Sequence, residues 1–201
     1  MVELAVDGAV FTFPDGWEVS KYDEWPYFRA ALSKIQDPAG KALHGCDVVA
    51  LDGDHLWLIE AKDYAYPEAR EPKDLVAVVA EKVMDTLAGL HAGTRDEHAK
   101  REICRKAVRA RTLYVALRID LPGAQPHAGR GRQAAAQQTM ANYRQKLRRS
   151  LRRVVNGKVH VITGREDPST VAWTVRWSEA GRQDHGSRRA FEGRRRVDEE
   201  G

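Results

Sequence analysis

The chain has 201 residues, of which 42% are hydrophobic and 31% are charged, and its formal net charge is +4. These values indicate a globular protein long enough to bury a core, and they exclude fibrous and wholly disordered classes. No apolar run approaches the roughly 18 residues of a membrane span, and the first residues lack a signal-peptide pattern, so we expect a cytoplasmic protein. The two cysteines, Cys46 and Cys104, lack the spacing of zinc ligands, which indicates reduced, buried side chains.

The amino-terminal part of the chain predicts two hairpins with a helix between them. Residues 2–13 alternate between apolar and polar around Asp7-Gly8, which is typical of a hairpin. Residues 20–35 predict a first helix, with Pro26 in its opening turn. A loop leads to residues 45–64, GCDVVALDGDHLWLIEAKDY, whose two apolar runs flank an Asp-Gly-Asp turn. This stretch predicts two paired strands.

The rest of the chain alternates between helical and strand patterns. Helices are expected over 72–90, closed by Gly93, over 96–110 and in a basic stretch around 130–153; strands are expected over 112–120, 158–164 and 170–178. Interleaved helices and strands predict an α/β core, here a single domain over 1–178. Residues 179–201 are charged, Gly-rich and nearly free of apolar side chains, so we expect a disordered tail.

The register of the second hairpin places two acids and a lysine on one face. If Gly53 and Asp54 form the loop, Asp47 lies directly opposite Glu60. A two-residue loop shifted by one position makes the acids diagonal neighbours on the same face, whereas a three-residue loop separates them. Lys62 follows Glu60 by two positions and shares its face. The remaining positions on both faces are largely apolar, which indicates a central sheet covered on both sides.

Two acids opposite each other in an apolar layer need a cation. Like charges at paired positions destabilise a hairpin, and a buried charge is costly unless it is paired. Hard oxygen ligands bind Mg²⁺, for which Mn²⁺ can substitute, and a nearby lysine can position or activate a water molecule. The pattern therefore predicts a metal-dependent hydrolytic site.

Asp47, followed thirteen residues later by Glu60-Ala61-Lys62, resembles the motif of the PD-(D/E)xK nuclease superfamily. The stretch is most similar to the nuclease-related-domain and restriction-endonuclease-like branches, and the resemblance covers about residues 17–120. Cys46 stands where the motif has proline. The resemblance implies a restriction-endonuclease-like three-layer core, with a central mixed β-sheet flanked by helices. It also implies a Mg²⁺-dependent deoxyribonuclease that hydrolyses phosphodiester bonds, in defence against foreign DNA or in DNA repair.

The resemblance also assigns roles to single residues. Asp47, Glu60 and the main-chain carbonyl of Ala61 would hold the metal. Lys62 would orient the attacking water or stabilise negative charge on the phosphorane.

Three more charged residues are candidates for the same site. The superfamily often adds an acid from the first helix; Glu24 is the candidate metal ligand and Asp23 its rival. Both also fit a second interpretation, in which acids near a helix start complement the helix dipole. Lys82 in the second helix is within reach of the site, but a solvated helix face is the favoured interpretation for it.

A basic helix is the second functional feature. Residues 129–155 contain eight basic residues and no acid. The spacing of Met140, Tyr143, Leu147, Leu151 and Val154 indicates the core-facing stripe. The nucleic-acid-binding candidates on the other faces are Arg144, Arg148, Arg149, Arg152 and Arg153, although a solvated arginine-rich surface explains them equally well.

The expected partner is DNA, with RNA left open, and specificity would come from a homodimer or a partner protein. Two alternatives remain on the sequence alone. One is a non-catalytic member of the same fold that binds nucleic acid or protein, and the other is an interaction scaffold whose basic helix contacts an acidic protein.

Overall fold

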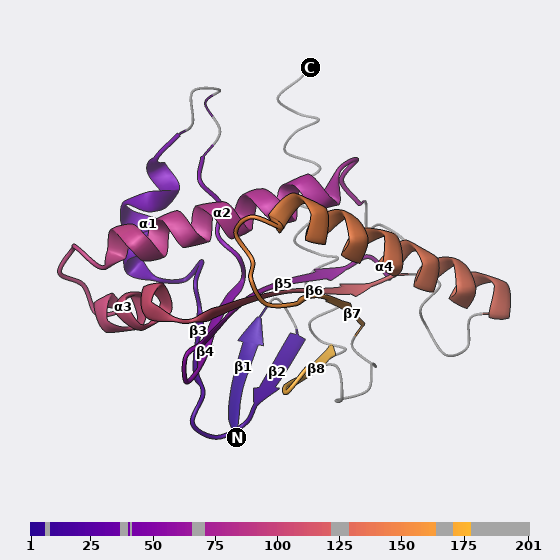
Figure 1. Cartoon of the computed structure of the whole chain (residues 1–201), viewed down its shortest axis with the longest axis horizontal. Helices are drawn as coiled ribbons and strands as arrows, with labels where there is room; N and C mark the ends of the chain where they lie inside the picture. Colours follow the sequence, from indigo (N-terminus) through magenta and orange to yellow (C-terminus); the bar gives the residue numbers. More distant parts are fainter. Residues whose placement is uncertain are drawn as a thin grey trace, which may run out of the picture.

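The computed structural model describes residues 1–6, 9–36, 40, 42–65, 71–121, 129–163 and 171–177. The expected disordered tail, residues 179–201, and the expected Asp7-Gly8 turn lie outside the described residues. The described residues form a helical layer, a five-stranded sheet and a three-stranded sheet (Figure 1).

The five-stranded sheet is mixed, as expected. Its strand order is β3 (Glu18–Lys21), β4 (Val48–Asp52), β5 (His55–Asp63), β6 (Thr112–Asp120) and β7 (Val159–Ile162). The β3–β4 and β4–β5 pairs are antiparallel, whereas β5–β6 and β6–β7 are parallel. Parallel neighbours require crossover connections, and here these contain helices.

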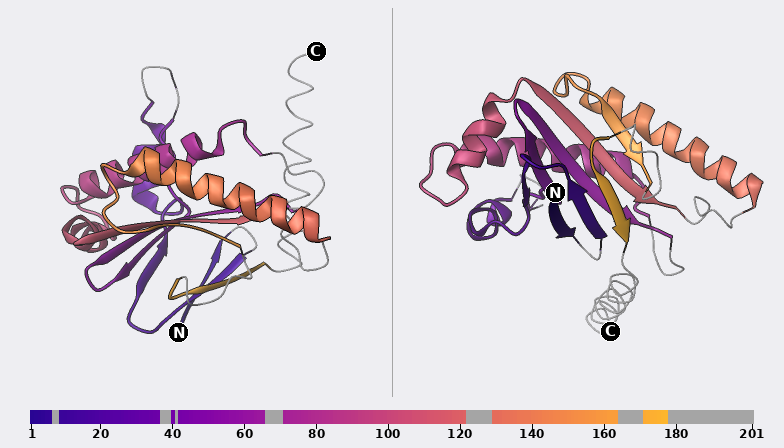
Figure 2. Two further views of the ribbon diagram at one scale, coloured as in Figure 1. Left: turned by 45° about the vertical axis from the view of Figure 1, so that its right-hand side comes forward. Right: turned by 90° about the horizontal axis from the view of Figure 1, so that it is seen from below.

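The helices cover one face of this sheet (Figures 1 and 2). They are α1 (Pro26–Ala30), the 3₁₀ turn η1 (Leu32–Lys34), α2 (Leu75–Gly93), α3 (Arg101–Arg109) and α4 (Arg130–Leu151). The chain passes from β5 to β6 through α2 and α3, and from β6 to β7 through α4. Among the described helices, none is long and apolar enough to cross a membrane.

A second sheet covers the opposite face, where further helices were expected. It has the order β1 (Val2–Val6), β2 (Ala9–Phe13) and β8 (Thr174–Trp177). Phe11 and Phe13 of β2, and Trp173 just before β8, are buried in one cluster with Trp57 and Ile59 of β5. Every second side chain of β2 is buried against the five-stranded sheet. The three-stranded sheet therefore covers the face that helices were expected to cover.

The expected first helix, residues 20–35, is only partly helical. Residues 18–21 form β3, paired with β4, and α1 begins at Pro26. Pairing with a central strand outweighs the local helical pattern, and Pro26 has no N–H to donate within a helix, so the helix begins there. The short helix is held by its buried aromatic side chains, Trp25 and Phe28.

Candidate functional site

The hairpin between β4 and β5 has the register that places the two acids opposite each other. Asp52 pairs with His55 and Val48 pairs with Ile59, so the loop contains only Gly53 and Asp54. Gly53 has φ 58°, in the left-handed region that favours glycine. The prediction of a two-residue loop that keeps both acids on one face is confirmed.

The acids lie on the face beneath the helices. On this face β4 and β5 contribute Val49, Leu51, Leu56 and Leu58 to the helix-side core. Glu60 continues this alternation and is fully buried, and Asp47 is 5% exposed. A wholly apolar layer therefore ends in two carboxylates at the carboxyl end of β5.

Asp47 is fixed by main-chain hydrogen bonds. Its Oδ2 accepts a hydrogen bond of 2.7 Å from the N–H of Ala61, and its carbonyl accepts one of 3.1 Å from Tyr22. The β4–β5 ladder ends at the Val48–Ile59 pair, so the carboxylate takes the place of the next main-chain acceptor. Because N–H and C=O of one strand residue point to the same side, the carbonyl of Ala61 also faces this end of β4.

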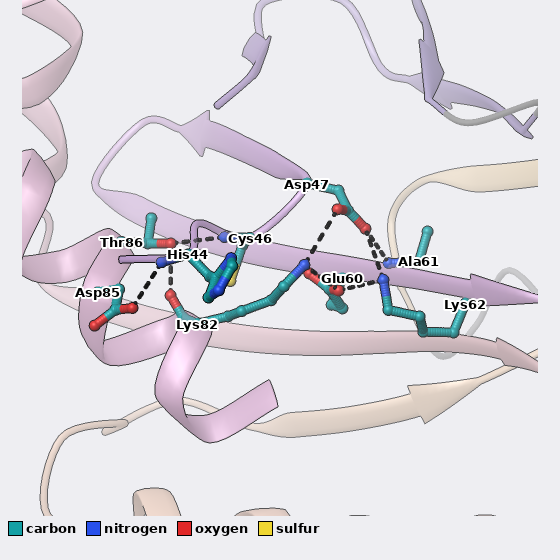
Figure 3. A network of polar contacts seen from close by, with 9 residues as sticks. All are labelled: His44, Cys46, Asp47, Glu60, Ala61, Lys62, Lys82, Asp85 and Thr86. Carbon is teal, nitrogen blue, oxygen red and sulfur yellow. Dashed lines mark hydrogen bonds and ion pairs between the residues drawn. The ribbon is translucent and has the colours of Figure 1, made fainter. Parts of the chain in front are cut away.

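Glu60 uses one oxygen for two cations (Figure 3). Its Oε1 lies 2.5 Å from Nζ of Lys62 and 2.6 Å from Nζ of Lys82. Its Oε2 is buried and has no hydrogen-bond partner among the described residues. Burial raises the pKa of Glu60, and the charge of Asp47 raises it further, while the two lysines act in the opposite direction.

The two lysines also face Asp47. Nζ of Lys62 lies 3.9 Å from its Oδ2, and Nζ of Lys82 lies 3.7 Å from its Oδ1. Burial alone would lower the pKa of each lysine, but Glu60 and Asp47 raise both values above that of a free lysine. Two ammonium groups therefore balance two carboxylates in this cluster.

The favoured interpretation of Lys82 as a solvated residue is wrong. Its side chain is 18% exposed and reaches across from α2 to Glu60. The signal for this was its place between Val79, Val83 and Thr86, all of which are buried. A charged residue bordering the apolar stripe of a helix can reach beneath that helix to a buried carboxylate.

Helix α2 also holds the segment that leads into Asp47. The hydroxyl of Thr86 accepts a hydrogen bond of 2.8 Å from the N–H of Cys46 and donates one of 2.7 Å to the carbonyl of Lys82. The carboxylate of Asp85 accepts a hydrogen bond of 2.8 Å from the N–H of His44. One helix therefore sets both Lys82 and the start of β4 (Figure 3).

The expected acid from the first helix does not join the cluster. Glu24 and Asp23 precede α1 rather than lying in its first turn. The carboxylate of Glu24 lies 2.6 Å from Lys21 and 4.0 Å from Arg29, and its hydrogen bond with Lys21 lowers its pKa. Within the described ranges, no group of three or more His, Cys, Asp or Glu side chains is placed to hold a metal ion.

The cluster nevertheless fits a Mg²⁺ site of the kind that uses few protein ligands. Mg²⁺ keeps several waters and commonly takes one or two carboxylates together with substrate phosphate. Asp47 and Glu60 supply two carboxylates, and the unpartnered Oε2 of Glu60 is an available hard oxygen. The carbonyl of Ala61 lies on the same side of β5 as the Asp47 carboxylate. An unpartnered buried carboxylate oxygen is costly, which a cation would relieve.

The five arginines expected to bind nucleic acid are exposed on the carboxyl-terminal part of α4 and just beyond it. The helix buries Ala136, Met140, Leu147 and Leu151, most of the stripe expected from the sequence. Val154, expected in that stripe, is 37% exposed because the helix ends at Leu151. None of the described ion pairs joins these arginines to the carboxylate cluster.

Comparisons with known proteins yield a partial match to a curated protein. No family model matches the chain, and no solved structure matches it. Over an alignment of 153 positions, the chain is 28% identical to a cysteine–tRNA ligase of Neisseria meningitidis. The match covers 61% of this chain and 22% of the ligase. Similarity of this identity and extent shows neither a family nor an activity.

Proposed function

We propose that the protein is a metal-dependent nuclease with a restriction-endonuclease-like core that hydrolyses phosphodiester bonds in DNA. One observation carries the proposal: Asp47, just before β4, and Glu60, on β5, both contact Lys62 beneath the helices, next to a run of apolar side chains. An ordinary structural ion pair needs one acid and one base, not two acids facing each other. The β-hairpin with Asp-x₁₂-Glu-x-Lys supports the same assignment.

Asp47 and Glu60 would hold Mg²⁺, together with the carbonyl of Ala61. A bound Mg²⁺ supplies charge neutralisation at the scissile phosphate and acidifies water. The unpartnered Oε2 of Glu60 would be the oxygen offered to the metal, while Lys62 and Lys82 stay at Oε1, at 2.5 and 2.6 Å.

The two lysines would orient the attacking water and stabilise the negative charge that develops during hydrolysis. The oxygen of water forms a bond to phosphorus as the bond to the leaving oxygen breaks, and negative charge develops on the phosphoryl oxygens. Lys62 orients the water and, as a cation, stabilises that charge. Lys82 approaches from α2 and contributes a second positive charge at the same position. A water proton finally reaches the leaving oxygen.

The exposed arginines of α4 support a polyanionic substrate, because Arg side chains bind phosphate independently of sequence. The curated relative is a ligase of tRNA, so RNA belongs among the tested substrates. Specificity would come from a partner protein or a second copy. The alternative is a non-catalytic member of the same fold that binds nucleic acid or protein through these arginines.

The test compares wild type with Lys62→Ala and Glu60→Gln on supercoiled plasmid, linear duplex and tRNA. Each reaction contains Mg²⁺ or Mn²⁺, and a parallel one contains EDTA. Lys106→Ala is the matched control, since Lys106 is an exposed lysine that pairs with Glu18 away from the cluster. Circular dichroism confirms that every variant is folded.

Metal-dependent cutting that Lys62→Ala and Glu60→Gln abolish, and that Lys106→Ala preserves, supports the nuclease. Cutting that survives both site substitutions rejects this site. No cutting of any substrate, with no metal binding, rejects the proposal and leaves a structural ion cluster in a binding protein.

A further inference from the structure

The end of α4 carries a run of positive charge. We define the α4 basic segment as Arg144, Arg148, Arg149, Arg152, Arg153 and the following Lys158, all of which are exposed. No carboxylate in the described part of the chain lies within ion-pair distance of any of them. Like charges this close repel one another unless an anion lies nearby.

Several arginines elsewhere on the surface have acidic neighbours. Arg105 on α3 lies 3.7 Å from Glu102, and Arg176 on β8 lies 3.8 Å from Glu3. Arg111 lies 3.4 Å from Asp54 at the hairpin loop. The α4 basic segment therefore differs from these three arginines, because no described acid pairs with any of its members.

Helix α4 lies on the same face of the sheet as the carboxylate cluster. It packs against β7, and its buried side chains Met140, Leu147 and Leu151 belong to the helix-side core together with Val161 of β7. The strand β7 pairs with β6, and β6 pairs with β5, which carries Glu60. The helix therefore lies over a strand two positions away from the site, at about 5 Å per strand.

The segment ends near the amino ends of the parallel strands, whereas the carboxylate cluster lies toward their carboxyl ends. Asn156 accepts a hydrogen bond of 2.8 Å from the N–H of Leu113 and donates one of 2.7 Å to the carbonyl of Arg111. These contacts hold the chain after α4 at the amino end of β6. Lys62 is paired with Ile119, six residues along β6 from Leu113, which corresponds to about 20 Å.

The arginines advance along α4 in regular steps. Arg144, Arg148 and Arg152 are four residues apart, so each step along the helix axis is about 6 Å and the three together span about 12 Å. A duplex rises about 3.4 Å per base pair. The far end of the segment, about 15–20 Å from the carboxylates, therefore corresponds to roughly five or six base pairs.

We propose that the α4 basic segment is a phosphate-binding surface that holds a nucleic-acid chain about five or six base pairs away from the bond that is cleaved. This inference rests on the proposed function and adds a substrate class to it. The substrate is a polymer long enough to cover both regions. Helix α4 binds the backbone phosphates of the substrate, and the carboxylates and lysines of the β4–β5 site hydrolyse it.

The first experiment measures binding of the full chain to a duplex of about 24 base pairs at several salt concentrations. Each lost phosphate contact reduces the slope of log affinity against log salt by about 0.9. Arg148→Gln/Arg152→Gln should therefore reduce the slope by about 2. The matched control Arg105→Gln/Arg176→Gln removes the same charge from paired arginines and should leave the slope unchanged.

The second experiment compares cleavage of that duplex with cleavage of a hairpin-capped duplex of about five base pairs. Arg148→Gln/Arg152→Gln should raise KM on the long substrate at least tenfold, leave kcat unchanged, and have no effect on the short one. Equal slopes in this variant and the control overturn the inference, whether or not the protein cuts. A slope change confined to this variant, without any cutting and without metal binding, supports the surface and rejects the nuclease. Cutting with equal effects on both substrate lengths overturns the inference and preserves the nuclease.

Discussion

Lys82 and Glu60 lie 22 positions apart in the sequence, and their side chains form a 2.6 Å ion pair between helix α2 and strand β5. Because Lys62 binds the same carboxylate oxygen at 2.5 Å, Glu60 has two cations at one oxygen and none of the described hydrogen bonds at the other. The arrangement keeps the pair of acids neutralised and leaves one hard oxygen for a metal ion.

Lys82→Met should destabilise the protein by about 2–3 kcal/mol, since it leaves buried carboxylates with a single ammonium group. The free energy of unfolding, measured with urea, checks this. Lys106→Met is the matched control, because Lys106 is exposed where it pairs with Glu18, and its unfolding midpoint should match wild type. Adding Glu60→Gln to Lys82→Met should recover much of the loss; a double variant less stable than Lys82→Met alone would contradict the ion-pair account.

Mg²⁺ should raise the melting temperature of wild type. A metal that binds only the folded state stabilises it by about 2.7 kcal/mol at one hundred times its dissociation constant. Asp47→Asn and Glu60→Gln should each abolish this response, whereas Asp52→Asn, an exposed acid on the same hairpin, should keep it. Differential scanning fluorimetry with and without EDTA gives the answer, and a response that survives at Glu60→Gln excludes this site.

The second hairpin and the strand after the α2–α3 helices were predictable because their patterns are local. The strand over 112–120 has the bounds expected, since residues 113–117 form a continuous apolar run with polar residues on either side. The register followed from the Asp-Gly-Asp turn, because the period of a strand leaves few arrangements once the loop length is known.

The features that were missed depend on contacts distant in sequence. Ser20 and Lys21 were expected to begin a helix, but they form the end of β3, which becomes a strand only by pairing with β4. β8 pairs with β2, far away in the chain, so no local pattern assigns it to the second sheet. Lys82 reads as a surface lysine until α2 is placed over β5.

Thr86→Val should destabilise the protein by about 1–3 kcal/mol, because it leaves the buried N–H of Cys46 without an acceptor. It should also reduce activity, since this N–H lies next to Asp47. The matched control is Thr139→Val, whose hydroxyl donates to the carbonyl four residues earlier but has no such second partner. Chemical denaturation gives the free energy of unfolding of both variants. An equal decrease in the two would mean that the hydrogen bond to Cys46 contributes nothing to stability.

Gly89→Ala should destabilise the protein although alanine favours helix. A Cβ at Gly89 would lie 2.0 Å from the hydroxyl oxygen of Tyr22 and 2.7 Å from Leu32, both buried. Overpacking costs about 1–3 kcal/mol and exceeds the helical gain of about 1 kcal/mol. Gly131→Ala on α4 meets nothing within 4 Å and should be neutral or slightly stabilising. Thermal melts of both variants test this, and a stabilised Gly89→Ala would show that α2 can move away from Tyr22.

Acid should destabilise the protein through His160. Burial lowers its pKa, and Lys158 and Arg144 lower it further, so the folded state binds the proton less readily than the unfolded state. Stability from the neutral ring is complete above the unfolded value of about 6.5 and declines as pH falls below it. His160→Gln should reduce the loss of stability between about pH 7.5 and 5.5, and His91→Gln, at an exposed position on α2, should not. Urea midpoints at the two pH values measure this difference, and an unchanged acid sensitivity in His160→Gln would assign the effect to other groups.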